Sequence, residues 1–193
     1  MEYHLTTPLS KEPLKALRAG DVVYITGEFI TARDKAHARM AEYFKGHRQL
    51  PFKLEGAAIF HGAPIVKKEG EEWKIVAIGP TTSARMNDLE PAVIGHGAAA
   101  IIGKGGMGPD VLAALRDNGA VYLSMTGGTA VLGARMVKKV LGLIWEDLGM
   151  SEAVWLLEVE NFGPLTVTMD AHMGDLYEAV RRRASENIKD MRL

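Results

Sequence analysis

Three short segments of the sequence combine glycine, hydroxyl and cationic side chains, the residue types that bind anions. They read TARDKAHAR from Thr31, GPTTSARM from Gly79 and GKGGMG from Gly103. Each follows an apolar stretch that predicts a β-strand. In α/β sheets the loops after the strands expose backbone N–H groups and helix N-termini to ligands. The pattern favours a carboxylate or phosphate site built from these loops.

Arginines supply the charge of the first two segments. Arg33 is expected in the first turn of a helix, where the helix dipole disfavours a cation, so we predict that it faces an anion. A pair with Asp34 or another surface carboxylate would explain it as well. Arg85 follows the hydroxyl residues Thr81, Thr82 and Ser83, and its guanidinium suits two parallel hydrogen bonds to a carboxylate. The alternative for the hydroxyls is that they only cap a helix.

The third segment presents Lys104 among glycines. It lacks the order of a nucleotide P-loop, in which the lysine follows the last glycine and precedes Ser or Thr. The lysine could still reach a ligand without steric competition, and the alternative is a flexible turn with an exposed lysine. A fourth loop, Gly127-Gly128-Thr129, could approach a ligand by its backbone, but close packing is the role we expect for it.

The six histidines give a weaker signal. His37 lies four residues after Arg33 and so on the same helix face. His61 follows a predicted strand. No two histidines have the spacing of a known zinc motif, so we expect a structural or surface role for each.

Alternating strands and helices must position these loops. A β-branched and aromatic stretch predicts a strand over Asp21–Ile30, Thr31 is a plausible N-cap, and a helix is expected over Ala32–His47. Further strands are expected over 56–62, 74–78, 98–102, 120–125, 153–159 and 165–169 (the last two joined by a turn at 160–164), and helices over 86–94, 109–118, 129–141 and from Asp175 into a charged tail. This order predicts an α/β fold with a largely parallel, buried sheet flanked by helices.

Composition narrows the class of protein. Apolar residues make up 47% and charged residues 24% of 193 residues, which fits one globular domain over 1–193. The net charge of −1 offers no basic excess for nucleic acid. No apolar run is long enough for a membrane span and Met1–Ser10 is polar, so we expect a cytoplasmic protein. The chain has no cysteine, so it cannot ligate an iron–sulfur cluster through its own thiols.

Several motifs in fixed order carry a resemblance to a known family. The strings are ITARDKAHARM, IGPTTSARMNDL, IIGKGGM, SMTGGTAVL and LGMSEAVWLLEVENFGPLTV. In this order they resemble the β subunit of class I fumarate hydratases, a family that includes the β subunit of L(+)-tartrate dehydratase and the C-terminal domain of single-chain class I fumarases. The resemblance runs from about Leu5 to Tyr177.

The resemblance implies a swivelling β/β/α domain that closes over a partner α subunit, whose three cysteines hold a [4Fe–4S] cluster. Matching motifs place the substrate-binding residues of the family on Arg33, Thr81, Arg85 and Lys104. Thr81 would be the catalytic base, or would position the substrate for a base on the partner. The KGGM of this chain departs from the KGNR of single-chain relatives, so the arginine that follows the lysine loop there is missing here.

The activity that the resemblance implies is the interconversion of fumarate and (S)-malate, a reaction of the tricarboxylic acid cycle. The alternatives are dehydration of L(+)-tartrate to oxaloacetate, and a non-catalytic anion-binding or regulatory domain. The expected partners are the cluster-bearing α subunit and a small dicarboxylate, in an α2β2 assembly or with a homodimer of this chain.

Overall fold

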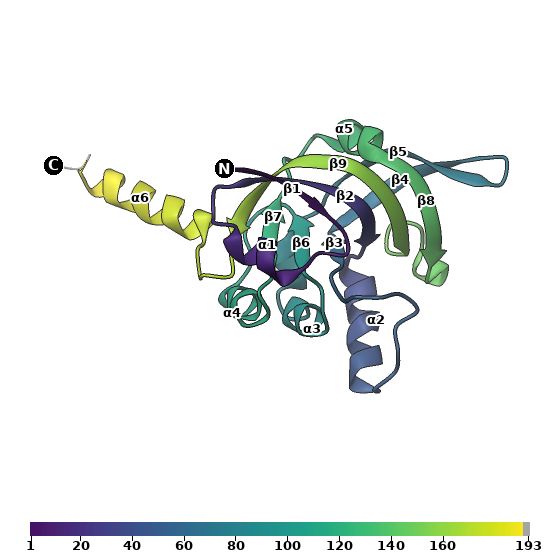
Figure 1. Cartoon of the computed structure of the whole chain (residues 1–193), viewed down its shortest axis with the longest axis horizontal. Helices are drawn as coiled ribbons and strands as arrows, with labels where there is room; N and C mark the ends of the chain where they lie inside the picture. Colours follow the sequence, from purple (N-terminus) through teal and green to yellow (C-terminus); the bar gives the residue numbers. More distant parts are fainter. Residues whose placement is uncertain (191–193) are drawn as a thin grey trace.

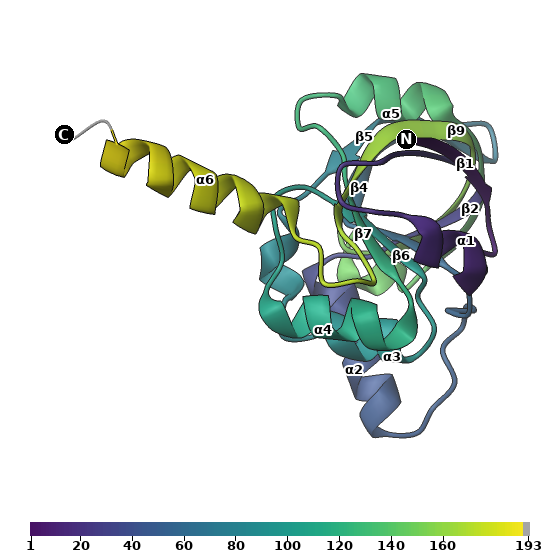
Figure 2. The ribbon, with the colours of Figure 1, turned by 60° about the vertical axis from the view of Figure 1, so that its left-hand side comes forward.

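A sheet closed into a barrel forms the centre of the computed structural model, which describes residues 1–190 (Figures 1 and 2). Its order is β1-β2-β3-β6-β7-β9-β8, and an additional pairing of β2 with β9 closes it. The strands are β1 (Glu2–Thr6), β2 (Val22–Thr31), β3 (Ala58–Phe60), β6 (Ala100–Gly103), β7 (Val121–Ser124), β8 (Val137–Ile144) and β9 (Val154–Met169).

The sheet is mixed, so the expectation of a largely parallel sheet was wrong, although the α/β class is confirmed. β1, β2, β3, β6 and β7 pair in parallel, but β9 runs antiparallel to β2, β7 and β8. A separate antiparallel hairpin consists of β4 (Gly62–Glu69) and β5 (Glu72–Pro80).

The error arose from β9, which was expected as two strands joined by a turn. The chain does not turn at 160–164. Asn161 takes a positive φ of 46°, and its N–H donates to Thr26 Oγ1 at 3.0 Å while the pairing with β2 shifts register. A bulge of this kind bends a strand without ending it. One long strand can therefore pair with β2 along its length and close the barrel.

Helices cover the barrel unevenly. They are α1 (Lys11–Ala16), α2 (Asp34–Lys45), α3 (Glu90–Gly95), α4 (Pro109–Asn118), α5 (Ala130–Met136) and α6 (Leu176–Asp190), with 3-10 turns η1 (Ser83–Met86) and η2 (Glu146–Leu148). In Figure 1, α2, α3 and α4 lie together on one side, α5 lies on the other side, and α6 projects from the body. None of the helices in residues 1–190 is both long and apolar enough to cross a membrane.

Most helices lie where the sequence predicted them, and α4 matches residue for residue. The helix expected over 129–141 is half right, because α5 ends at Met136 and the chain continues as β8. β1, α1 and β4 were not predicted. The predicted charged C-terminal tail falls on α6 up to Asp190, and its last three residues lie outside the described residues.

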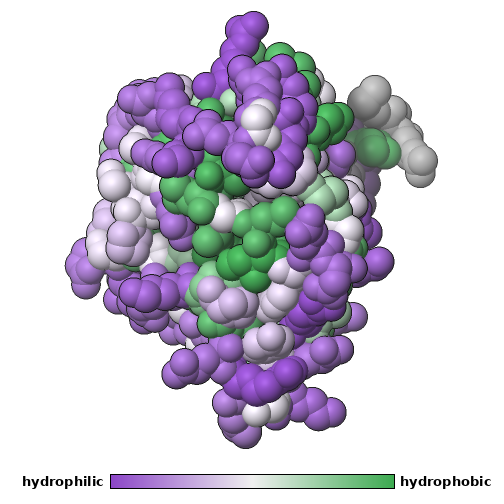
Figure 3. Space-filling view, turned by 90° about the vertical axis from the view of Figure 1, so that its right-hand side faces the viewer, coloured by the Kyte–Doolittle hydropathy of each residue, from purple (hydrophilic) through white to green (hydrophobic). Residues whose placement is uncertain are grey.

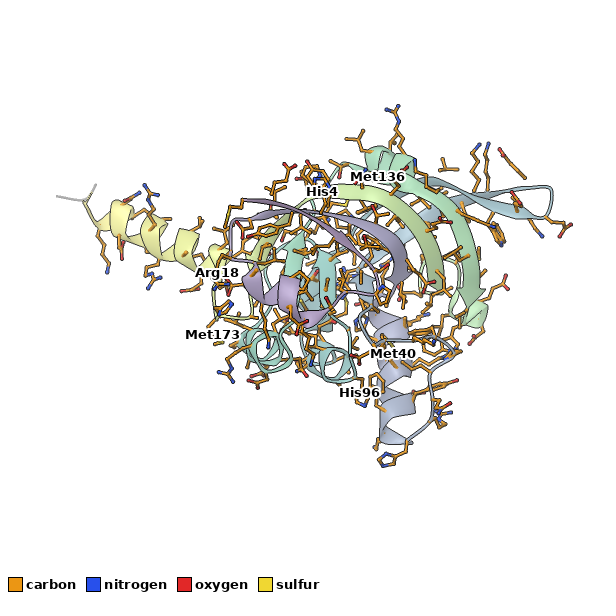
Figure 4. All side chains as sticks on the ribbon, viewed as in Figure 1. His4, Arg18, Met40, His96, Met136 and Met173 are labelled. Atoms are coloured by element: carbon orange, nitrogen blue, oxygen red, sulfur yellow. The ribbon has the colours of Figure 1, made fainter. Side chains whose placement is uncertain are left out.

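Two apolar clusters hold the loops in place. One contains the aromatic group Phe29, Phe60 and Phe162, in which Phe29 and Phe162 have ring centroids 4.9 Å apart. The other contains Ile59 and Met40, a residue of α2 that is labelled in Figure 4. Because Ile59 and Phe60 belong to different clusters, β3 is buried on both faces, as strands in parallel arrays are. The ends of these strands are therefore rigid supports.

Candidate active site

The loops singled out in the sequence follow β2, β5 and β6, and backbone hydrogen bonds join the last two. Lys104 N–H donates to Thr81 O at 3.2 Å, and Ser83 N–H donates to Lys104 O at 3.1 Å. Thr81 N–H in turn donates to the carbonyl of His61, which follows β3, at 2.6 Å. Lys104 is therefore not on a flexible turn, because its loop is paired with its neighbour.

Arg85 connects this pair of loops to the N-terminus of α2. Its Nε and Nη2 donate to the two carboxylate oxygens of Asp34 at 2.8 Å each, and Nη2 also donates to Thr81 Oγ1 at 3.0 Å. The hydrogen bond from Arg85 lowers the pKa of Asp34 to about 2. The guanidinium therefore lies between a carboxylate and the threonine hydroxyl, with Nη1 left outside these contacts.

Arg33 is the N-cap of α2, because the helix begins at Asp34, two residues later than expected. Its Nη2 lies 3.4 Å from Glu152 Oε1, and its Nη1 donates to Ser151 O at 3.4 Å. Its Nε is buried and has no hydrogen-bond partner within residues 1–190. These long contacts hold the cation loosely. Thr31 is not the N-cap that we predicted, because its Oγ1 accepts a hydrogen bond from Trp155 N–H at 2.9 Å.

The hydroxyls of the second loop do not act as helix caps. The N-cap of η1 is Thr82, which makes no side-chain capping bond. Thr81 Oγ1 accepts from Arg85, and the side chain of Ser83 is buried against His61 and Tyr122. The capping alternative is therefore wrong, since the hydroxyl of Thr81 contacts Arg85 and that of Ser83 contacts buried polar groups.

Two of the loop glycines are explained by close approach and by backbone conformation. A Cβ on Gly103 would collide with Ser83 Oγ, so the two loops could not meet. Gly128 has a φ of +81° and open space around it, so our expectation of close packing was wrong for this residue. The nearest neighbour of a Cβ on Gly127 would be Lys104 Cδ at 3.8 Å. The fourth loop therefore lies beside the lysine.

The structure thus brings the four predicted residues to one edge of the barrel by different means. Thr81 and Arg85 are in direct contact, Lys104 is joined to Thr81 through the backbone, and Arg33 precedes the carboxylate that holds Arg85. Their roles toward a substrate stay predictions.

Beneath this edge lies a buried polar trio that sequence reasoning missed: His37, Glu90 and His61, each with a fully buried side chain. His37 Nε2 lies 3.0 Å from Glu90 Oε2, and His61 Nε2 lies 2.8 Å from the same oxygen. The three residues come from α2, α3 and the connection after β3. No local motif signals this arrangement, since His37 and Glu90 are 53 residues apart.

The trio carries balanced charge. Burial raises the pKa of Glu90, but the two imidazoles outweigh it and lower the value to about 2, so Glu90 is ionised. Burial opposes protonation of His37, yet Glu90 raises the pKa of this imidazole above its ordinary value. Burial lowers the pKa of His61, which is therefore neutral. One anion thus faces one cation.

These three side chains are also the group among residues 1–190 whose donor atoms could surround a metal ion, since the atoms lie within 4.8 Å of one another. The Nδ1 atoms already have partners: Arg33 O for His37 and Ser83 Oγ for His61, each at 2.9 Å. Because His37 Nε2 is hydrogen-bonded directly to the carboxylate, we interpret the trio as an ion pair with a neutral histidine and not as a metal centre.

Comparison with known proteins gives consistent matches. The family model described as "Fumarase C-terminus" matches residues 1–180. The Escherichia coli K12 protein named L(+)-tartrate dehydratase subunit beta is 42% identical over 177 residues, which cover 91% of this chain and 87% of that protein. A Methanocaldococcus jannaschii protein with the same name, given provisionally, is 46% identical over 193 residues, 99% of this chain and 98% of that one.

A longer protein matches as well. A Geobacillus stearothermophilus protein provisionally named fumarate hydratase class I is 36% identical over 190 residues. The match covers 97% of this chain but 36% of that protein. This chain therefore corresponds to one part of the longer polypeptide.

Proposed function

The chain belongs to the Fumarase C-terminus family, and we propose that it is the β subunit of a hydro-lyase that acts on a four-carbon dicarboxylate together with an α subunit. One observation carries the assignment of the site. Arg85 hydrogen-bonds to the hydroxyl of Thr81 at the edge of the barrel where Arg33 and Lys104 also lie.

The two arginines are already paired with carboxylates of the chain itself. Asp34 holds Arg85 through two hydrogen bonds, and Glu152 lies 3.4 Å from Arg33. Carboxylates therefore fit both guanidinium groups. A dicarboxylate would bind by sharing these cations or by taking the place of the weaker partner, and the longer contact identifies Glu152 as the one that is more easily displaced.

Dehydration of a 2-hydroxy dicarboxylate removes a proton from one carbon and hydroxide from the next. As the proton leaves, negative charge moves onto the neighbouring carboxylate, so Arg33, Arg85 and Lys104 would stabilise the transition state more than the bound substrate. Thr81 as base would have to lose its own proton first and act as an alkoxide, which the adjacent guanidinium favours electrostatically; taking the substrate proton would restore the hydroxyl. Thr81 as a positioning donor, with the base on the partner, uses the same contact.

An iron–sulfur cluster could act at this site only if a partner subunit binds it. The chain has no cysteine, so no residue here offers the thiolate ligands of a [4Fe–4S] centre. We propose that the α subunit binds the cluster. When bound there, it would supply a Lewis acid that polarises the leaving hydroxyl.

The substrate is either (S)-malate, with fumarate as its product, or L(+)-tartrate, with oxaloacetate as its product. The family resemblance was interpreted in favour of fumarate. The two matches with the higher identities, 46% and 42%, carry tartrate dehydratase names, and each of these proteins aligns over most of its length. This observation favours tartrate as the second candidate. The two substrates differ by one hydroxyl, which a polar contact can discriminate strongly.

The test is reconstitution of the pair. The chain should be inactive alone and should become active when mixed anaerobically with its α subunit, iron and sulfide, assayed on fumarate, (S)-malate and both tartrates. Activity of the chain without a partner would refute the shared site. Failure of the complete pair on all four compounds would refute the assignment. Size measurement of the active pair would test our proposal of a heteromer, with α2β2 as its simplest symmetric form. We also propose that this heteromer is cytoplasmic.

A further inference from the structure

A row of buried polar side chains runs beneath all three loops of the site. We propose that this row is a positioning network that fixes the spacing of the three loops for the dicarboxylate, a proposal that rests on the function proposed above. The network consists of His37, Glu90, His61, Ser83 and Tyr122.

The network begins at the first loop. His37 Nδ1 donates to the carbonyl of Arg33 at 2.9 Å, and its Nε2 donates to Glu90 Oε2 at 3.0 Å. Both acceptors lack a hydrogen, so both ring nitrogens must carry one and the ring is an imidazolium. The N-cap residue Arg33 is thereby attached to the N-terminus of α3, where Glu90 lies.

The middle of the network supports the second loop. His61 Nε2 lies 2.8 Å from the same Glu90 oxygen but outside hydrogen-bond geometry, and His61 Nδ1 is hydrogen-bonded to Ser83 Oγ at 2.9 Å. The backbone of His61 is also fixed, because its N–H donates to Ile102 O at 2.7 Å and its carbonyl accepts from Thr81 N–H at 2.6 Å. A displacement of His61 would therefore displace Thr81.

The far end of the network supports the third loop. The hydroxyl of Tyr122 lies 2.9 Å from Ser83 Oγ and 2.9 Å from the carbonyl of Gly105. Burial raises the pKa of Tyr122, so the hydroxyl keeps its single proton and donates it to Gly105 O or to Ser83 Oγ. Gly105 is the residue after Lys104, so this contact fixes the backbone that carries the lysine.

Stability alone does not explain such a network. Buried ion pairs replaced by well-packed apolar residues are often neutral or more stable. An apolar core lacks directional contacts, whereas the hydrogen bonds of this row link one loop to the next. The same loops carry the groups that would contact the substrate. Preorganisation of such groups is what catalysis by positioning requires.

The first test uses variants that remove one hydroxyl each, Tyr122→Phe and Ser83→Ala, in the reconstituted pair. Loss of one buried hydrogen bond should raise KM for the dicarboxylate about tenfold, with a smaller fall in kcat. Because both act on the Lys104 loop, the double variant should raise KM by less than the product of the two single effects. Tyr43→Phe is the control, since Tyr43 lies near the C-terminal end of α2, outside the network.

If Tyr122 and Ser83 only stabilise the fold, their variants should show different kinetics. Partial unfolding lowers the amount of active enzyme and thus the apparent kcat, while KM stays the same. A KM within twofold of the unmodified pair for both Tyr122→Phe and Ser83→Ala would therefore overturn the proposal.

The second test needs no activity. Hydrogen exchange of the amides of residues 104–106 is measured in the isolated full-length chain. Tyr122→Phe should speed this exchange about tenfold and leave α4 unchanged, whereas Tyr43→Phe should alter neither. Equal exchange in Tyr122→Phe and the parent chain would overturn the network. Faster exchange together with an inactive pair would support the network and refute the proposed hydro-lyase.

Discussion

Two layers of charge lie one above the other at the same edge of the barrel, and they differ in how freely their partners can change. The outer layer is the two pairs Arg85–Asp34 and Arg33–Glu152, with side chains 41% and 39% exposed in the first pair and 23% and 14% in the second. The inner layer is the trio of His37, Glu90 and His61, with no exposed side-chain surface.

The difference in burial indicates different roles for the two layers. Ion pairs near solvent contribute little net stability because water and salt compete for both charges. A ligand can therefore take one partner from the outer layer at small cost. A buried charge that loses its partner has no water to replace it, so the inner layer keeps one arrangement. The outer layer suits binding, and the inner layer suits support.

The largest expected effect comes from breaking the inner layer. Glu90→Leu leaves the His37 imidazolium without its anion and should lower the free energy of unfolding of the chain by about 3–5 kcal/mol, measured by urea denaturation. The double variant His37→Phe/Glu90→Leu removes both charges and should lose much less. The single variant His37→Phe is measured as well. If the double variant loses as much free energy of unfolding as His37→Phe and Glu90→Leu lose in sum, the two charges do not interact as described.

Removing a cation from the outer layer should have the opposite effect, with a large loss of activity and little loss of stability. Arg85→Ala should lower kcat/KM of the reconstituted pair at least about 100-fold, because a charge-assisted contact to the substrate is lost. The free energy of unfolding should change by less than about 1 kcal/mol. The matched control is Arg39→Ala, which removes an arginine that is paired through two hydrogen bonds with Asp147 outside the site. Near-parental kinetics for Arg85→Ala would remove this residue from the site.

Lowering the pH should also affect the stability of the two layers differently, but by less than the substitutions above. The pKa of Glu90 lies at about 2 instead of 4.5, so the stability that it provides is present above pH 4.5 and is lost as the pH falls toward 2. The raised pKa of His37 gives stability that is present below pH 6.5 and lost as the pH rises through the raised value. The neutral His61, whose pKa is lowered by burial, opposes part of this gain below pH 6.5.

Urea midpoints measured between pH 2 and 7 test this assignment. The pKa of Asp34 also lies at about 2, but its side chain is 39% exposed, so solvent screens its contribution. Asp34→Asn should therefore leave most of the acid loss in place, and Glu90→Gln should remove most of it. If Asp34→Asn removes the larger part of the stability loss in acid, the outer ion pair stabilises the fold more than the buried trio does, contrary to our assignment.

The sequence predicted the outer layer far better than the inner one. Arg33 and Lys104 follow β2 and β6, and parallel strands bring such loops to one edge regardless of their distance along the chain. Thr81 and Arg85 follow β5 of the separate hairpin, and backbone hydrogen bonds to His61 and Lys104 hold their loop at that edge. Local patterns also placed most helices. The same reasoning failed for β8, because a short apolar stretch cannot be assigned to a helix or a strand by periodicity alone. It failed for β9 because residues 160–164 have the composition of a turn, whereas the strand continues through them.

The inner trio could not be predicted, because its contacts form only when the sheet has closed. His37 and Glu90 are 53 residues apart, and His61 and Ser83, which contacts the trio, are 22 residues apart. A lone histidine or glutamate carries no sign of its partner in the sequence. The one available signal was His37 on the helix face of Arg33, which indicates a direction but no partner.

The smallest effect that we predict is that of salt, and it concerns the outer layer alone. Raising NaCl from 0.1 to 1 M shortens the screening length from about 10 to about 3 Å, so KM for a dianionic substrate should rise on the order of fivefold. Sucrose at equal osmolarity is the control and should leave KM unchanged. The stability difference between the parent chain and Glu90→Leu should not respond to salt, because buried charges are screened much less. A loss of that difference in salt would mean that water reaches the trio, and the two layers would then be one.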